Sequence, residues 1–357
     1  MNISSKILNV LLILLLPVGF VSCGANDYAG GGIGGTGISV GKITASGTGT
    51  VDVNGIKFDT SNAAVTLDGM TGGQSKLKRG MVVKIAGTFN PDGTTGVAAN
   101  IEFKDILEGP VDSVGSNTLI VLGQTVNVSS STNYDDFSDI NSDGILDVND
   151  IMEGNIVEVS GFVDTGGVVH ATYISLKAVS TAGDGFEIEL KGTITNLNTV
   201  EGTFIIGSLL IDYNIADFKD MIVGDLNNEL YVEVKSSSVV LGGVLIASKI
   251  ELEDKKHHID HGDEFEVEGY VTDTSVLLAE NKFELEGQTV LITSNTIFEN
   301  GASVADIVVD VKIEVEGKVD AFGVLIADKI KINAGDDGDS DDSSESDHVE
   351  NGENDPS

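Results

Sequence analysis

The chain has 357 residues, with 57 acidic against 20 basic side chains, one cysteine and no tryptophan. A formal net charge of −37 argues against a nucleic-acid partner, because binding to a polyanion requires a basic surface that releases counterions. Hydrophobic residues make up 41% of the chain, which excludes wholesale disorder, and 44 glycines indicate many strands joined by tight turns.

Residues 1–23 have the features of an export signal. Lys6 supplies a positive charge, and residues 7–20 form an apolar run too short and too interrupted for a membrane-spanning helix, which needs about 20 residues. The run ends in Val21-Ser22-Cys23, which resembles the site where bacterial lipoproteins are cleaved and acylated. We therefore expect a lipoprotein signal peptide with Cys23 lipidated; an ordinary signal peptide or an uncleaved anchor is the alternative.

The lipoprotein resemblance also implies a location. Gly24, instead of an aspartate, follows the cysteine, which implies a cell-envelope protein held in the outer membrane by its lipid, on either the periplasmic or the surface face. The glycine-rich residues 24–37 are expected to form a flexible tether. A phosphate-binding loop is excluded there, because no strand precedes the glycines and no Lys-Ser/Thr follows them.

An internal repeat organises the next 300 or so residues. An Ala-x-x-Ile pattern recurs at residues 98–101, 171–174, 247–250 and 327–330. Three kinds of glycine recur in the same order upstream of it: an opening glycine (Gly41, Gly109, Gly192, Gly269), a glycine between two apolar runs (Gly55, Gly123, Gly207, Gly287) and a glycine that closes an alternating strand (Gly87, Gly161, Gly317, with Lys235-Ser236 in the third copy). The markers predict β repeats at 38–104, 105–178, 185–252 and 264–333, a linker at 253–263 and a tail at 334–357.

Within a repeat the hydrophobic period is two, as in half-buried strands, for example in residues 313–316 and 157–159. Residues 51–58 predict a hairpin in which Asn54-Gly55 supplies the positive φ angles of a type I′ turn. Each repeat is predicted to have five strands with a short helix between the third and fourth, which is the order of the OB-fold. The fold class is therefore all-β, with four tandem five-stranded OB-like barrels; a β-sandwich of paired units is the alternative.

Three segments together resemble a known bacterial family. They are residues 31–37 (GGIGGTG), 53–60 (VNGIKFDT) and 151–161 (IMEGNIVEVSG). They resemble the "domain of unknown function 5666" family, found as tandem β-rich modules in exported proteins and lipoproteins. The resemblance is best in repeats one, two and four. It implies β modules, and it implies no activity and no catalytic residue.

An Asp-rich segment in the second repeat matches a calcium-loop template. Carboxylate and amide oxygens two residues apart converge on one ion, and Gly144 permits the sharp turn between them. The flanking segments are strands, so a free-standing loop is expected instead of an EF-hand; a solvated acidic turn is the alternative. The candidate Ca²⁺ ligands are Asp139, Asn141, Asp143, Ile145 through its carbonyl, Asp147 and Asp150.

A weaker metal candidate lies in the linker between repeats three and four. His257 and His261, with Asp260 or Asp263, offer ligands for a transition metal, although a polar hinge is the alternative. Residues 334–357 carry many acidic and no basic side chains, which predicts a disordered acidic tail.

No catalytic constellation stands out from the sequence. His170 lies in an alternating strand, and Arg79 lies in a turn with Lys76 and Lys78. We therefore expect a non-enzymatic, lipid-anchored envelope protein that serves as a structural, adhesion or binding surface for an envelope protein or glycan. A calcium-dependent binding protein is the alternative, and a hydrolase of an envelope polymer is a remote one.

Overall fold

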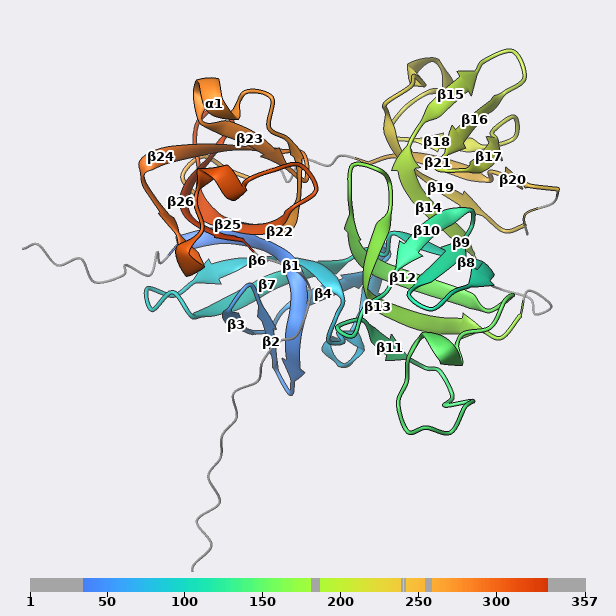
Figure 1. The fold of residues 1–357 in the computed structure, drawn as a ribbon, viewed down its shortest axis with the longest axis horizontal. Coiled ribbons are helices and arrows are strands. Elements are labelled where there is room, and N and C mark those ends of the chain that lie inside the picture. The colour runs from blue at the N-terminus through green and yellow to red at the C-terminus, as the bar shows by residue number, and fades with distance from the viewer. Residues whose placement is uncertain (1–34, 181–186, 239, 241, 254–258, 333–357) are drawn as a thin grey trace, which may run out of the picture. The chain divides into compact units, whose positions relative to one another are not determined.

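A computed structural model describes residues 35–180, 187–238, 240, 242–253 and 259–332. The expected signal peptide, Cys23, most of the tether and the acidic tail lie outside the described residues. The described part is all-β, and none of its helices is long and apolar enough to cross a membrane. Figure 1 shows its strands in chain order.

The first repeat closes a five-stranded barrel. β1 pairs antiparallel with β2 and β6, β2 with β3, and β6 with β7, while β3 pairs parallel with β7. β4 and β5 form an added hairpin, and a 3₁₀ turn, η1, precedes β6. The elements are β1 (Gly35–Gly47), β2 (Thr50–Val53), β3 (Ile56–Asp59), β4 (Ala64–Leu67), β5 (Met70–Gly72), η1 (Gln74–Lys76), β6 (Val82–Phe89) and β7 (Thr95–Phe103).

The second repeat has the same circuit of pairings. β8, β9, β10, β13 and β12 follow one another around the ring, and only the β10–β13 pair is parallel. The elements are β8 (Leu107–Val114), β9 (Thr118–Val121), β10 (Gln124–Asn127), β11 (Asn133–Asp135), η2 (Val148–Asp150), β12 (Ile156–Val163) and β13 (Val169–Ala178).

In the third repeat the circuit is divided between two sheets. β14 pairs with β19 and β19 with β21, while β15, β16, β17 and β20 form the other sheet. The breaks fall within the first and last strands of the repeat. The elements are β14 (Ile188–Thr193), β15 (Thr195–Asn198), β16 (Thr203–Ile206), β17 (Leu209–Asp212), β18 (Asp217–Lys219), η3 (Val223–Asp225), β19 (Tyr231–Ser236), β20 (Val244–Ile246) and β21 (Lys249–Leu252).

The fourth repeat closes through β22, β23, β24, β26 and β25. A four-residue helix that the sequence does not predict, α1, stands between its first two strands. The elements are β22 (Glu264–Asp273), α1 (Leu277–Glu280), β23 (Lys282–Leu285), β24 (Gln288–Phe298), η4 (Glu299–Gly301), η5 (Val304–Asp306), β25 (Lys312–Val319) and β26 (Leu325–Ile332).

The recurring glycines have a steric reason. Gly161 lies opposite Ala171 at a register shift between β12 and β13, and a Cβ there would lie 2.2 Å from the carbonyl oxygen of His170. Gly87 and Gly317 face the equivalent carbonyls at 2.2 and 2.0 Å. The closing glycine and the alanine of the Ala-x-x-Ile pattern thus face each other where the two strands approach closely at the register shift. In the third repeat Ser236 stands at this place, and its hydroxyl donates to the carbonyl of Ile246 at 2.7 Å.

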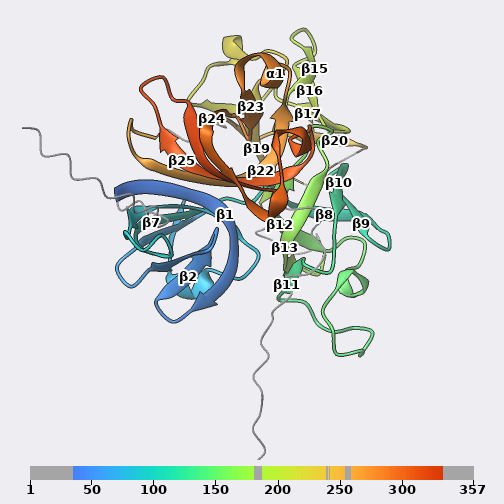
Figure 2. The same cartoon turned by 60° about the vertical axis from the view of Figure 1, so that its left-hand side comes forward.

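Strand pairing also joins the repeats to one another. β1 of the first repeat pairs parallel with β22 of the fourth (Figures 1 and 2), and β8 of the second pairs antiparallel with β14 of the third. Repeats two and three share one continuous hydrophobic core, while repeats one and four each have their own. The repeats therefore pack in two pairs, and the first strand of each repeat makes the joint.

Candidate functional site

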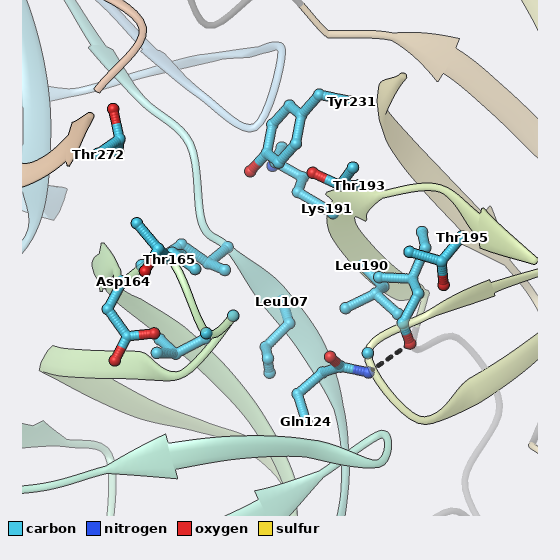
Figure 3. Close-up of a pocket in the computed structure, with 18 of the residues that line it drawn as sticks. Leu107, Gln124, Asp164, Thr165, Leu190, Lys191, Thr193, Thr195, Tyr231 and Thr272 are labelled. Carbon is cyan, nitrogen blue, oxygen red and sulfur yellow. Dashed lines mark hydrogen bonds between the residues drawn. The ribbon is translucent and has the colours of Figure 1, made fainter. Parts of the chain in front are cut away.

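A cleft of about 620 Å³ lies where the second, third and fourth repeats meet (Figure 3). The β12–β13 connection supplies one wall, and the β14–β15 segment supplies the other. Thr272 and Glu286 reach it from the fourth repeat. Because each wall comes from a different repeat, the cleft depends on how the repeats are joined.

The β12–β13 connection is a tight turn held by Asp164. One oxygen of its carboxylate accepts from the backbone N–H of Val168 at 2.9 Å, and the other lies 2.9 Å from Nε2 of His170. The next residue, Thr165, is fixed from the fourth repeat, because its N–H and hydroxyl both donate to Asp310, at 2.8 and 2.9 Å. His170 thus supports the turn from β13, and the turn presents a rigid, glycine-containing rim.

The opposite wall carries hydroxyl groups above an apolar floor. Thr193, Thr195 and Tyr231 lie on the third repeat, with Leu107 and Leu190 between the walls (Figure 3). Gln124 ties the two repeats together at the base, since its Nε2 donates to the carbonyls of Leu122 and Ile206, each at 3.0 Å.

Lys191 lines the cleft, and its ammonium group is already paired with neighbouring acidic residues. Its Nζ donates to the carbonyl and carboxylate of Asp105, at 2.6 and 3.1 Å, and lies 3.0 Å from Glu233. Burial opposes its charge, but the two carboxylates outweigh burial and raise the pKa of Lys191. The described lining offers hydrogen-bond donors and acceptors from threonine and tyrosine hydroxyls and from Asp164 and Glu286.

The structure places the predicted calcium-loop residues between β11 and β12. The two carboxylate oxygens of Asp139 accept from the N–H groups of Asp143 and Gly144, at 3.2 and 2.8 Å, and Asp143 accepts from Ile145 at 2.8 Å. These bonds curl the loop around Gly144, which has a φ of +84°.

At the end of the loop, the carboxylates of Asp147 and Asp150 accept hydrogen bonds from backbone N–H groups. Asp150 is buried, and its two oxygens accept from the N–H groups of Ile140 and Asp147, at 2.8 and 3.1 Å. Asp147 in turn caps η2 by accepting from Asn149. Among the described residues, the groups of three acidic side chains close enough to hold one ion lie elsewhere, and the Asp139–Asp150 loop is not among them.

The weaker metal candidate is only partly described. His257 lies outside the described residues. In the described part, Nδ1 of His261 lies 3.3 Å from the carbonyl of Val319, and Asp263 accepts from the hydroxyl of Thr36 at 2.6 Å. The backbone N–H of Asp263 donates to the carbonyl oxygen of Asp260 at 3.1 Å, which makes this segment a turn before β22.

Sequence reasoning missed the cleft. Its residues are separated by up to 180 or so positions, and those that belong to a motif, Gly192, Gly207 and Gly287, mark the repeat and not a site. Gly166-Gly167 is a further local signal, because it marks the turn that forms the rim.

Comparison with protein families gives three matches along the chain. The family model described as "Domain of unknown function (DUF5666)" matches residues 40–102, 108–175 and 268–331, which together exceed half of the chain. The matches fall on the first, second and fourth repeats. No curated protein matches the sequence.

Proposed function

Since the chain belongs to the DUF5666 family of domains of unknown function, we propose its role from its own geometry: a non-enzymatic, lipid-anchored envelope protein whose β modules present a binding cleft. The single observation that carries the proposal is the cleft at the meeting point of three repeats. Lipidation of Cys23, attachment to the outer membrane and a disordered acidic tail are parts of the same proposal and rest on the sequence.

We further propose that all four repeats are OB-like barrels. The order of pairing, first strand to second, second to third, third to fifth and fifth to fourth, supports this for each repeat. So does the 3₁₀ turn that precedes the fourth strand in each. The third repeat reaches this order through interrupted strands.

A glycan is the ligand class that the cleft favours. OB-folds bind oligonucleotides or oligosaccharides through loops that include the connection of strands four and five, and that connection in the second repeat forms the rim here. A net charge of −37 disfavours the oligonucleotide. The threonine and tyrosine hydroxyls, with Asp164 and Glu286, match the dense hydroxyl groups of a neutral sugar chain.

Cleft-filling substitutions test the proposal. Thr195→Trp and Thr272→Trp place an indole in the cleft, and Thr94→Trp adds the same bulk to an exposed turn of the first repeat. The three variants and the original chain would be probed on an array of bacterial envelope oligosaccharides, and hits measured by titration calorimetry. We expect the two cleft variants to lose at least tenfold in affinity and Thr94→Trp to bind normally. Binding that all three variants retain would contradict the cleft as the site.

The Asp139–Asp150 loop supports a second candidate function, calcium-dependent binding. The specific observation is the curl imposed by Asp139, whose carboxylate accepts from Gly144 five residues later. Asp139 and Asn141, at the first and third positions of the template, both accept from the N–H of Asp143, at 3.2 and 3.0 Å. A chelator that abolishes ligand binding would favour this candidate over the first.

A further inference from the structure

A row of glutamates crosses the joint between the second and third repeats. On β8, Glu108 lies directly opposite Glu158 of β12 on one side and Glu189 of β14 on the other. Like charges directly opposite on neighbouring strands are destabilising. Glu158 and Glu189 are buried, so water screens the repulsion poorly.

Two aspartates complete the group. Asp105, in the connection between the first two repeats, is 2% exposed, and Asp68 comes from the β4–β5 hairpin of the first repeat. The carboxylate of Asp68 accepts from the N–H of Asp105 at 2.9 Å. Oxygens of Asp68, Asp105 and Glu189 lie within 4.8 Å of one another, as do those of Asp105, Glu108 and Glu158. Oxygens bound to one Ca²⁺ at about 2.4 Å are separated by no more than about this distance.

Three lysines neutralise these five carboxylates only in part. Lys191 donates to the carboxylate of Asp105 at 3.1 Å. Lys177 contacts Glu158 at 2.6 Å and Glu108 at 3.5 Å, and Lys235 contacts Oε1 of Glu189 at 2.6 Å. Oε2 of Glu189 is buried without a hydrogen-bond partner in the described part of the chain, and the residue is 7% exposed. An unpaired, buried carboxylate oxygen is costly, so it marks a place where a positive partner is missing.

The pKa values of several of these carboxyl groups are raised. Burial is the main cause that raises the pKa of Asp68 to about 6 and that of Glu108 to about 7. The pKa of Asp105 is raised well above its usual value, again mainly by burial. Burial and the neighbouring Glu189 also raise the pKa of Glu187. Protons or a further cation would neutralise the charge that Lys177, Lys191 and Lys235 leave unpaired.

We propose that Asp68, Asp105 and Glu189 bind a divalent cation that prefers oxygen ligands, with Glu108 and Glu158 completing its surroundings. The donor set contains only carboxylate oxygens, which suits Ca²⁺ or Mg²⁺ and disfavours softer metals. The ligands come from the first repeat, the connection after it and the third repeat. The cation is therefore a staple between repeats, separate from the Asp139–Asp150 loop and joined to the cleft through Lys191.

An entry path exists beside the group. A cavity of about 420 Å³ between the first and second repeats is lined by Asp68, Glu158 and Lys177. A hydrated ion can reach the carboxylates from this side without unfolding of a repeat.

The test uses the full chain after treatment with a chelator, with Ca²⁺ and Mg²⁺ added separately at pH 7.5. Calorimetry gives the number of sites and the affinity, and thermal unfolding gives the change in Tm. The variants that remove ligands are Glu189→Gln and Asp105→Asn. Two controls keep the site: Asp139→Ala with Asp143→Ala in the loop, and Glu266→Gln, which removes another buried glutamate that faces a glutamate across two strands.

We expect one of the two ions to raise the Tm of the original chain and of both controls by several degrees, since a ligand that binds only the folded state stabilises it. In Glu189→Gln the rise falls to what the Asp139–Asp150 loop alone contributes, while its Tm without the ion is equal to or above that of the original chain, because a repulsive charge is gone. If Asp105→Asn folds, we expect its rise in Tm to fall as that of Glu189→Gln does. If it does not fold, Glu189→Gln alone decides the test. Absence of any response in the original chain, or an undiminished response in Glu189→Gln, would overturn the proposal.

Discussion

Replacement of Gly161 by alanine tests whether the recurring glycines are required by the close approach of two paired strands. The new Cβ would lie 2.2 Å from the carbonyl oxygen of His170 and 2.9 Å from the Cα of Ala171. Both atoms are backbone, so β12 and β13 must separate. Overpacking of this kind costs about 1–3 kcal/mol, and the upper part of that range applies because no side chain can rotate away. The general gain of a glycine-to-alanine change, about 0.4–1 kcal/mol, offsets part of it, which leaves about 2 kcal/mol.

Hydrogen exchange of the β12 and β13 amides measures this loss locally. A loss of about 2 kcal/mol corresponds to roughly 30-fold faster exchange when exchange follows the opening equilibrium. The matched control is Gly224→Ala, because no atom lies within 4 Å of its Cβ position and its φ is not positive. We expect its exchange to be unchanged or slightly slower. Equal protection of β12 and β13 in Gly161→Ala and in the original chain would refute the steric argument.

Three further predictions concern charge, calcium and the anchor. In chelator, the free energy of unfolding should fall as pH rises from about 4.5 to about 7.5, because Asp68 and Glu108 keep protons in the folded chain that the unfolded chain has lost. Asp68 alone accounts for up to about 3 kcal/mol of this fall. The free energy of urea unfolding of Asp68→Asn should therefore depend less on pH, and an unchanged dependence would rule out Asp68 as a cause. For the loop, titration of Ca²⁺ into Glu189→Gln should give heat that disappears when Asp139 and Asp143 are also replaced by alanine, and heat that persists would place calcium elsewhere. Finally, Cys23→Ala should move the protein from the membrane fraction to the soluble fraction on centrifugation, whereas continued sedimentation with membranes would argue against lipidation.

The sequence was sufficient for the family and for the all-β class. Period-two alternation and turn glycines act over a few residues, so they can be recognised without the fold. The Asn54-Gly55 hairpin is an example, since the structure gives φ angles of 51° and 78° at the two positions. The family expectation was confirmed by the matches over three repeats.

The joints between repeats could not be predicted, and neither could the two sites they create. Pairing of β1 with β22 depends on edges that any of the repeats could offer, and no local pattern selects one. Asp68, Asp105 and Glu189 look like ordinary polar positions of alternating or turn segments until three repeats bring them together. Helix α1 was missed because it spans only four residues and has no side-chain cap at Val276.

The position of β1 has a mechanical consequence. This strand is the first described element after the expected tether, and it is held antiparallel by β6 and parallel by β22. Tension that enters through its amino end runs along the strand, across the perpendicular hydrogen bonds to β6 and the slanted hydrogen bonds to β22. The bonds would then share the load in shear instead of opening one after another, and the first repeat would resist extraction with the help of the fourth.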